Sequence, residues 1–287
     1  MEVGLIGLGV MGSRMGANLN SAGLLKRVYN RTHQKAQEFE KTFGVRASSL
    51  QELVDECDVV LTMLSDDGAV RRVYSDMLPH LRSGQILAEM STIAPSTSVD
   101  LAYQVGKKGA TMYDAPVVGS SAGLEKKEVV VLVGGDASNF DNLSSVLKAV
   151  AKDVIYVGPN GTGLSLKLVH NLVLGTYIAS LGEAAHFGIR LGLSNDAIEK
   201  LFTSLSSVRS PNSALKIPKI LKGDYTPAFS LKHMVKDLGL IDVEAKRHHS
   251  SIPLSSLSLR LFRIAEERGL GDKDYIAVAE LFKQGIG

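Results

Sequence analysis

Short hydrophobic runs alternate with longer segments of helical periodicity along the first half of the chain. The runs predict β-strands at residues 3–7, 27–30, 59–63, 85–89, 111–115, 129–134 and 154–157. Between most of them, as at 11–19 and 34–43, apolar residues recur at three- and four-residue spacing, which predicts helices. Strands that alternate with helices indicate an α/β fold with a doubly wound parallel sheet covered on both faces.

The pattern changes after residue 157, where Gly158-Pro159-Asn160-Gly161 interrupts the strand-rich half. Residues 164–191 then predict one helix of about 28 residues, which at 1.5 Å per residue is about 40 Å long. Apolar residues crowd more than one side of it, so we expect it to pack against other helices, including those of a second subunit. Further helices are predicted at 197–205, 231–246, 253–267 and 276–283. We therefore divide the chain into an α/β domain, 1–161, and an all-helical domain, 162–287.

Composition and charge narrow the class of protein. The net charge of +2 and the 22% of charged residues give no reason to expect a nucleic-acid or membrane partner. The apolar stretches are judged shorter than the ~18 residues that span a bilayer, and the first residues lack a signal-peptide pattern. The single cysteine, Cys57, excludes an internal disulfide and fits a reducing compartment. The seven histidines show no metal-ligand spacing. We expect a cytoplasmic protein without a metal.

A glycine-rich motif follows the first predicted strand. The sequence Gly7-Leu8-Gly9-Val10-Met11-Gly12 matches G-x-G-x-x-G. Alone this pattern is weak, but here it links a strand to a helix, which is the context of a Rossmann-type dinucleotide-binding loop. Gly7 would permit the tight turn, Gly9 the approach of the pyrophosphate and Gly12 the packing of helix on strand. The helix N-terminus would bind the phosphates.

The end of the second strand predicts which nucleotide is preferred. NAD-selective sites place Asp or Glu there to bind the ribose 2′-hydroxyl. This chain has Asn30-Arg31-Thr32 instead, and no carboxylate before Glu38. A guanidinium binds phosphate with two parallel hydrogen bonds, so Arg31 favours NADP with its 2′-phosphate.

Several longer motifs, in a fixed order, carry a resemblance over nearly the whole chain. They are VGLIGLGVMGSRMGANL at 3–19, TMLSD at 62–66, EMSTIAP at 89–95, DAPVVGSSAG at 114–123, GPNGTGLSLKLVHN at 158–171 and FSLKHMVKDLGL at 229–240. The chain resembles the β-hydroxyacid dehydrogenases, which include 3-hydroxyisobutyrate dehydrogenase, tartronate semialdehyde reductase and glyoxylate/succinic semialdehyde reductase. NRT at 30–32, LSD at 64–66 and LGDKDY at 270–275 are most similar to the last of these, a branch that prefers NADPH.

The resemblance implies roles for individual residues. The family's catalytic lysine maps onto Lys167 and its neighbouring amide onto Asn171, four residues further along the predicted helix. Hydride transfer at an alcohol carbon needs a group that takes or returns the hydroxyl proton, and burial near a positive nicotinamide would lower the pKa of a lysine enough for this task. The cofactor-binding residues implied by motif and resemblance together are Gly7, Leu8, Gly9, Val10, Met11, Gly12, Asn30, Arg31, Thr32, Met63, Leu64, Ser65, Thr92 and Lys236.

The substrate loop departs from the family pattern. Val118 stands where a serine is expected to help bind the substrate carboxylate. The backbone N–H groups of Gly119 and Ser120, or the hydroxyls of Ser120 and Ser121, are candidates to replace it. A further candidate is Arg209, because it lies in a break between predicted helices near the expected domain cleft. The full set of expected substrate-binding residues is Ser91, Val118, Gly119, Ser120, Phe229, Asp237 and Arg209.

The sequence thus predicts an NADP-dependent oxidoreductase that acts on a short hydroxy acid or its aldehyde or keto acid, as a homodimer or homotetramer. A non-catalytic nucleotide-binding or scaffold relative is an alternative, although such a relative lacks the catalytic lysine. Imine reductases share the architecture but generally lack this lysine as well. A 6-phosphogluconate-type dehydrogenase would need a longer helical domain. Glyoxylate, succinic semialdehyde, 3-hydroxyisobutyrate and serine all fit the chemistry.

Overall fold

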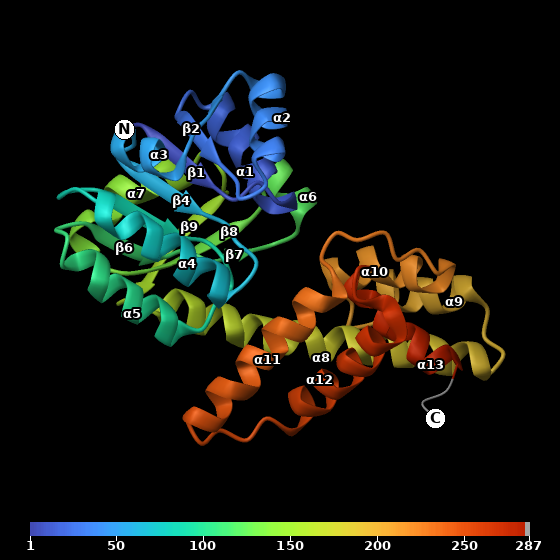
Figure 1. Ribbon diagram of the computed structural model, residues 1–287. Coiled ribbons are helices and arrows are strands. Elements are labelled where there is room, and N and C mark those ends of the chain that lie inside the picture. The colour runs from blue at the N-terminus through green and yellow to red at the C-terminus, as the bar shows by residue number, and fades with distance from the viewer. Residues whose placement is uncertain (285–287) are drawn as a thin grey trace. The chain divides into compact units, whose positions relative to one another are not determined.

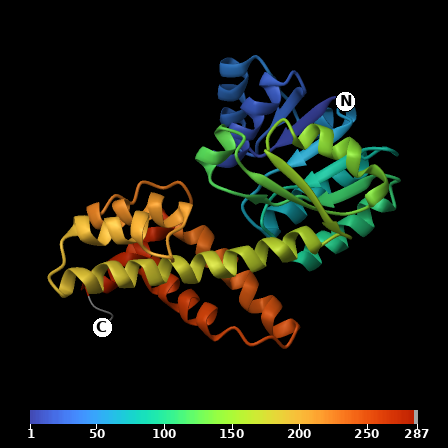
Figure 2. The ribbon, with the colours of Figure 1, turned by 180° about the vertical axis from the view of Figure 1, so that it is seen from behind.

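The computed structural model describes residues 1–284, which form two compact units: the first is Met1–Lys167, and the second begins at Leu168. Figures 1 and 2 show the chain from opposite sides. The units divide inside one helix, whereas the sequence placed the boundary between 161 and 162. The boundary between the units lies later in the chain because the first turn of this helix packs in the first unit, where Leu164 belongs to a hydrophobic cluster.

The first unit is built on a nine-stranded sheet with helices on its faces (Figure 1). The strand order is β3-β2-β1-β4-β5-β6-β8-β7, with β9 beside β8. The strands are β1 (Val3–Ile6), β2 (Leu25–Tyr29), β3 (Arg46–Ala47), β4 (Val59–Thr62), β5 (Ile86–Glu89), β6 (Thr111–Asp114), β7 (Val117–Val118), β8 (Val130–Gly134) and β9 (Asp153–Gly158). The helices are α1 (Val10–Ser21), α2 (His33–Phe43), α3 (Leu50–Glu56), α4 (Asp67–Met77), α5 (Pro95–Gly106), α6 (Ser121–Glu125) and α7 (Phe140–Leu147), with short 3₁₀ turns at Leu78–His80 and Ala137–Asn139.

The doubly wound parallel core predicted from the sequence is confirmed for β1 to β6. Leu5 and Leu61 pack in one hydrophobic cluster, while Ile6 and Val60 pack in the other. Alternate residues of each strand are therefore buried on opposite faces of the sheet. The sheet as a whole is mixed, however, because β8 runs antiparallel to both β6 and β7. The two-residue strands β3 and β7 are too short to give a periodic signal in the sequence.

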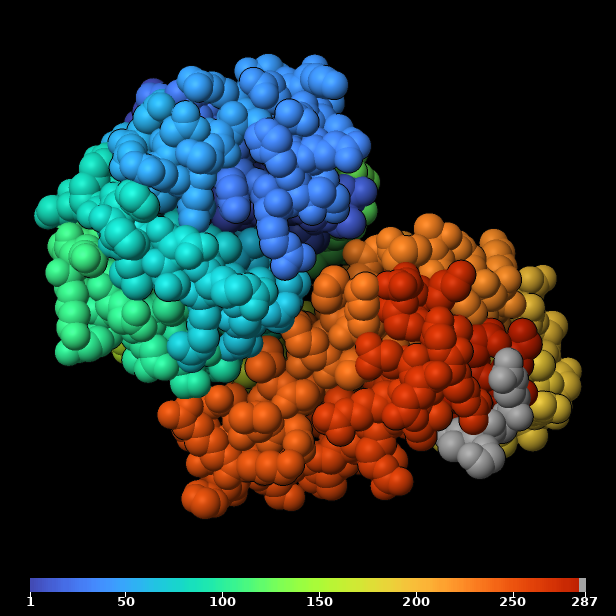
Figure 3. Space-filling view, viewed as in Figure 1, coloured from blue at the N-terminus to red at the C-terminus, as the bar shows by residue number. Residues whose placement is uncertain are grey.

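The second unit is all helical, as predicted. Its elements are α8 (Thr162–Arg190), which begins in the first unit, α9 (Asn195–Lys200), a π-helical turn at Leu201–Leu205, α10 (Pro211–Lys222), α11 (Leu231–Arg247), α12 (Pro253–Ala265), a π-helical turn at Glu266–Leu270, a 3₁₀ helix at Tyr275–Ala279 and α13 (Glu280–Gln284). They bury one core that includes Ile178, Ile217, Met234, Phe262 and Ile276. The orange and red residues of α11, α12 and the C-terminal helices form a closely packed surface in the space-filling view (Figure 3).

Helix α8 has nearly the predicted length, 29 residues against about 28, but it is more apolar than expected. It contains an 18-residue window with a mean hydropathy of 1.3, so by length and composition it is able to cross a membrane. Polar residues interrupt each apolar run of α8, whereas its many leucine, valine and alanine residues keep the mean hydropathy of the whole window high. A core helix satisfies the same criterion, and Ile178 and Leu181 of α8 lie in the hydrophobic core. The opposite side keeps Val169, Val173 and Phe187 exposed by 61–64%.

Candidate functional site

The glycine motif forms a tight turn between β1 and α1. Gly7 has a φ of +97°, and a Cβ there would lie 2.2 Å from the carbonyl oxygen of Met63. A Cβ on Gly12 would lie 1.9 Å from the Gly7 oxygen, so helix and strand approach only without side chains. A Cβ on Gly9 would meet nothing within 4 Å. Gly9 also caps α1 without a side-chain hydrogen bond. The helix N-terminus is therefore open for a phosphate group, which fits a bound dinucleotide.

Asn30 joins this loop to the end of β2. Its Oδ1 accepts the N–H of Leu8 at 2.9 Å, and its Nδ2 donates to the carbonyl of Thr32 at 3.0 Å. Asn30 is thus committed to shaping the loop. Arg31 and Thr32 follow it and are exposed. Among the residues that the structure describes, the guanidinium of Arg31 makes no ion pair within 4.0 Å. A cation without a protein partner beside the glycine loop suits the 2′-phosphate of NADP.

A buried hydrogen-bond network connects the loops after β4 and β5. The Oγ of Ser91 accepts the N–H of Leu64 at 2.7 Å, and the N–H of Ser91 donates to Glu89 at 2.8 Å. The hydroxyl of Thr62 donates to the other oxygen of Glu89 at 2.6 Å. The two segments predicted to contact the cofactor are thereby held at one edge of the sheet. Met63, Leu64 and Thr92 lie half-buried there, and Ser65 is exposed.

The predicted substrate loop lies between β7 and α6. Val118 is half-buried at the end of β7. Gly119 has a φ of +143°, and a Cβ there would lie 2.6 Å from Val129. The Oγ of Ser120 accepts the N–H of Gly123 at 3.0 Å, which leaves the Ser120 hydroxyl proton to be donated elsewhere. This part of the loop therefore keeps a hydroxyl donor beside the missing serine.

The start of α8 is fixed by Asp114, the last residue of β6. Its two carboxylate oxygens accept the N–H groups of Gly161 at 2.6 Å and Leu164 at 2.8 Å. A carboxylate at a helix N-terminus also interacts favourably with the helix dipole. Burial raises the pKa of Asp114 despite these hydrogen bonds. Lys167 follows less than one turn after Leu164, so the Asp114 anchor sets where that lysine leaves the sheet.

Lys167, Asn171 and Asp237 are all at least nine-tenths buried. Within the second unit, the Nδ2 of Asn171 donates to Asp237 Oδ2 at 2.7 Å. The ammonium of Lys236 lies 3.1 Å from the other oxygen, Asp237 Oδ1. The Oδ1 of Asn171 is buried and accepts no hydrogen bond from the residues that the structure describes. The amide is thereby oriented with a free acceptor, and helical spacing places it on the same side of α8 as Lys167.

Two other predicted substrate residues lie in the second unit. The ring of Phe229 stacks on His233 with centroids 6.0 Å apart and meets Tyr275 edge-on at 5.5 Å. Arg209 lies between the π-helical turn and α10 and is exposed. Its backbone N–H donates to the carbonyl of Ser206 at 3.1 Å. Its side chain has no ion-pair partner within 4.0 Å among residues 1–284.

Comparisons with known proteins agree with this geometry. Residues 2–158 match the model of the NAD binding domain of 6-phosphogluconate dehydrogenase, and 161–282 match the NAD-binding domain of NADP-dependent 3-hydroxyisobutyrate dehydrogenase. The chain is 31% identical to glyoxylate/succinic semialdehyde reductase 1 of Arabidopsis thaliana over 286 residues, 99% of both proteins. It belongs to the β-hydroxyacid dehydrogenase family.

Other relatives show how wide this family is. The dehydrogenase is 30% identical to an NAD-dependent L-serine dehydrogenase of Pseudomonas aeruginosa, with 98% of this chain and 97% of the relative covered. Its fold matches the crystal structure of 3-hydroxyisobutyrate dehydrogenase from Salmonella typhimurium with a TM-score of 0.89 and 29% identity, covering 98% and 100% of the two chains. The chain is therefore an oxidoreductase of a family that uses NAD(P), and the relatives differ in substrate and nucleotide.

Asp114 and Glu89 make buried hydrogen bonds in this dehydrogenase, but neither was among the site residues predicted from the sequence. Both lie in motifs that were recognised, DAPVVGSSAG and EMSTIAP. Glu89 is the last residue of its predicted strand, and Asp114 is the last but one of the next. Acidic residues at the carboxyl ends of two neighbouring parallel strands were an available signal, because such ends converge at the ligand-binding edge of the sheet. Which N–H groups they bind depends on tertiary packing.

Glu89 provides a prediction about stability. Burial raises its pKa from 4.5 to about 7, against the opposing effect of its hydrogen bonds. Between these values the folded protein holds a proton that the unfolded chain has lost, so stability falls as pH rises from about 4.5 to 7. From pH 5 to pH 7 the loss should be roughly 2 kcal/mol.

The measurement is the unfolding free energy of the wild type minus that of Glu89→Gln, by urea denaturation at several pH values. The glutamine variant lacks this ionisable group, so other titrations cancel in the difference. We expect the difference to decrease from pH 5 to pH 7. A difference that is constant over this range would show that Glu89 titrates normally.

Proposed function

We propose that the protein is an NADP-dependent dehydrogenase or reductase that interconverts a short hydroxy acid and its aldehyde or keto acid, with Lys167 as the general acid and base. The observation that carries the proposal is the buried Lys167 followed by Asn171, whose amide is held by Asp237 with its oxygen free. A buried lysine needs a functional or structural reason, and the aligned acceptor one turn away supports a proton-transfer role.

The residues of this chain have distinct tasks in the proposed reaction. In the oxidative direction neutral Lys167 takes the hydroxyl proton at Nζ, and the ammonium returns it to the developing alkoxide in the reductive direction. Bound NADP(H) accepts or supplies the hydride. The Asn171 oxygen accepts a hydrogen bond from the Lys167 ammonium or the substrate hydroxyl. Asp237 positions this amide, and the glycine loop with Arg31 binds the nucleotide.

Three observations support NADP over NAD. No carboxylate lies at the end of β2, where an NAD-selective site needs one. Arg31 is exposed beside the glycine loop, and Asn30 is occupied in holding that loop. Because relatives include an NAD-dependent enzyme, both nucleotides must be compared directly.

A substrate panel tests the function. Glyoxylate and succinic semialdehyde with NADPH, and 3-hydroxyisobutyrate and serine with NADP⁺, are followed by nicotinamide absorbance, with NADH and NAD⁺ in parallel. We expect turnover of at least one of these acids. No turnover of any acid with either nucleotide would contradict the proposed function and would favour a non-catalytic role.

We predict that Arg209→Met raises the KM for the preferred acid about tenfold, without changing the KM for NADP(H). A guanidinium binds a carboxylate with two charge-assisted hydrogen bonds, which would compensate for the hydroxyl absent at Val118. Steady-state kinetics with the acid and the nucleotide varied separately measure both constants. Acid KM values within about twofold of the wild type would leave carboxylate binding to the segment 119–121.

We further propose a cytoplasmic homo-oligomer that binds neither nucleic acid nor membrane. Exposed Val169, Val173 and Phe187 on α8 support association through this helix, because large apolar side chains at 61–64% exposure are stabilised by a partner surface. Analytical ultracentrifugation tests it: a dimer or tetramer is expected, and a monomer at micromolar concentration would contradict it.

A further inference from the structure

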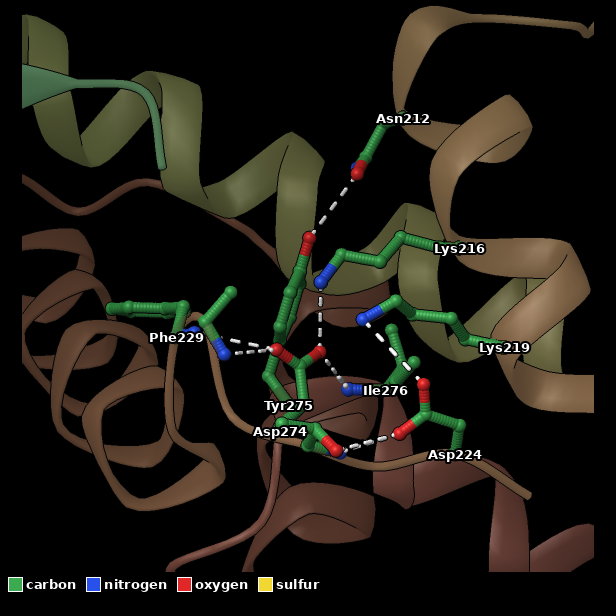
Figure 4. A network of polar contacts seen from close by, with 10 residues as sticks. Asn212, Lys216, Lys219, Asp224, Phe229, Asp274, Tyr275 and Ile276 are labelled. Atoms are coloured by element: carbon green, nitrogen blue, oxygen red, sulfur yellow. Dashed lines mark hydrogen bonds and ion pairs between the residues drawn. The ribbon is translucent and has the colours of Figure 1, made fainter. Parts of the chain in front are cut away.

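A buried ion pair links α10 to the residue before the 3₁₀ helix Tyr275–Ala279 in the second unit (Figure 4). The ammonium of Lys216 on α10 donates to Asp274 Oδ1 at 2.8 Å, and the two side chains are only 5% and 1% exposed. Asp274 precedes the 3₁₀ helix at Tyr275–Ala279. Desolvation of two charges is costly, and such pairs often contribute little net stability compared with apolar residues. This pair therefore needs an explanation beyond stability.

The second carboxylate oxygen of Asp274 binds a different part of the chain. Oδ2 accepts the backbone N–H groups of Ala228 at 2.9 Å and Phe229 at 3.3 Å. Figure 4 shows both contacts converging on this oxygen. The segment 225–231 is also paired with 270–275 along the backbone: Asp274 donates to Tyr225, Tyr275 to Phe229, and Leu231 to Lys273, each at 2.9 Å. Asp274 thus fastens the segment that leads into α11.

The same cluster positions the ring of Phe229. Tyr275 meets that ring edge-on at 5.5 Å, and the Lys216 ammonium lies 4.7 Å from the centre of the Tyr275 ring on its face. The Tyr275 hydroxyl donates to Asn212 Oδ1 at 3.3 Å. Lys216 therefore contacts both the carboxylate that binds the Phe229 backbone and the aromatic ring that packs on the Phe229 side chain. Backbone and side chain of Phe229 are fixed by one pair of charges.

We propose that Asp274 and Lys216 are positioning residues that hold Phe229 in place for substrate binding. The proposal rests on the proposed function and on the expectation, drawn from the family resemblance, that Phe229 contacts the substrate. The charged pair fixes the position of Phe229 specifically. The Asp274 carboxylate accepts several N–H groups at once, and the Lys216 ammonium fixes the orientation of that carboxylate. The expected consequence of its loss is a mobile Phe229 and weaker binding of the acid, with nucleotide binding unchanged.

The test uses the full-length double variant Lys216→Met/Asp274→Asn, which removes both charges so that neither is buried alone. Amide hydrogen exchange is measured at Ala228 and Phe229, together with the KM for the acid and the Kd for NADP. We expect exchange and acid KM each to rise about tenfold, while Kd for NADP stays within twofold. The single variant Lys216→Arg keeps the cation and should retain most of the acid affinity of the wild type.

Ser213→Ala is the matched control. Ser213 lies on the same helix, one turn before Lys216. The variant loses the partly buried hydrogen bond from Oγ to the Phe202 carbonyl at 2.8 Å and the contacts of the same Oγ with the Ser210 backbone. It has no contact with the Phe229 backbone in the hydrogen bonds described, so exchange at Ala228 and Phe229 should stay at the wild-type rate. If the double variant does not fold, Asp274→Glu, which moves the carboxylate by one methylene, should show the same changes more weakly.

Two results would overturn the proposal. Unchanged exchange at Ala228 and Phe229 would show that the pair does not hold the segment, and faster exchange with an unchanged acid affinity would show that the pair is only structural. Calorimetric binding of the hydroxy acid to the NADPH complex, which cannot accept a hydride, gives this affinity without turnover. A wild type that binds the acid but does not turn it over would reject the proposed function and still decide the role of the pair.

Discussion

Replacement of Lys167 by alanine is expected to lower kcat by about 10²–10⁴-fold, the usual contribution of a general acid or base. The methyl group of alanine can neither take the hydroxyl proton nor return it. The glycine loop and Arg31, which are proposed to bind the nucleotide, lie on elements other than α8, so the Kd for NADP should change by less than about twofold. Stopped-flow or steady-state absorbance gives kcat, and calorimetry gives the nucleotide Kd.

Lys148→Ala is the control, because Lys148 is an exposed lysine at the C-terminal end of α7. It should leave both constants at wild-type values. Retention of more than about a tenth of wild-type kcat by the Lys167 variant would refute the catalytic assignment. Loss of NADP affinity together with kcat would instead indicate that the substitution disturbs the start of α8.

The architecture was largely predictable from the sequence because each signal is local. The parallel strands are short and buried on both faces, and the helix Leu231–Arg247 has a clear apolar periodicity. Helix α10 was not predicted, because Pro218 lies inside Pro211–Lys222 and an interior proline usually ends or kinks a helix. The strand β8 was predicted at 129–134, but its antiparallel direction was not, because strand direction depends on the connection and leaves no trace in hydrophobicity.

The candidate site was predictable in its residue types but not in its pairings. The motifs indicated Lys167, Asn171 and Asp237, yet the sequence could not show that the Asn171 amide donates to Asp237 across 66 residues. The same holds for Asp274, which binds the backbone of Ala228 some 46 residues earlier. Contacts of this kind depend on how helices cross, and rotating one helix about its axis by the angle of a single residue would remove them. Local sequence therefore indicates which groups carry the chemistry, while tertiary packing orients them.

Substitution of Arg31 should separate the two nucleotides. We expect Arg31→Ala to weaken NADP binding by about 10- to 150-fold, which corresponds to the roughly 1.5–3 kcal/mol of a charge-assisted hydrogen bond. The physical reason is the location of Arg31, exposed at the end of β2 with no ion-pair partner among residues 1–284, where a 2′-phosphate is the group that distinguishes NADP from NAD. NAD lacks this phosphate, so its affinity should change by less than about twofold.

The ionic strength of the assay provides a second criterion, because a contact between two charges weakens as salt screens it. The Kd of the wild type for NADP should therefore rise with salt more steeply than that of the variant, and the two should converge at high salt. Arg27→Ala is unsuitable as a control because Arg27 is paired with Glu56, whereas Lys35→Ala removes an exposed cation on α2. An equal loss of affinity for both nucleotides in Arg31→Ala would mean that Arg31 supports the loop as a whole, and the preference for NADP would then need another residue.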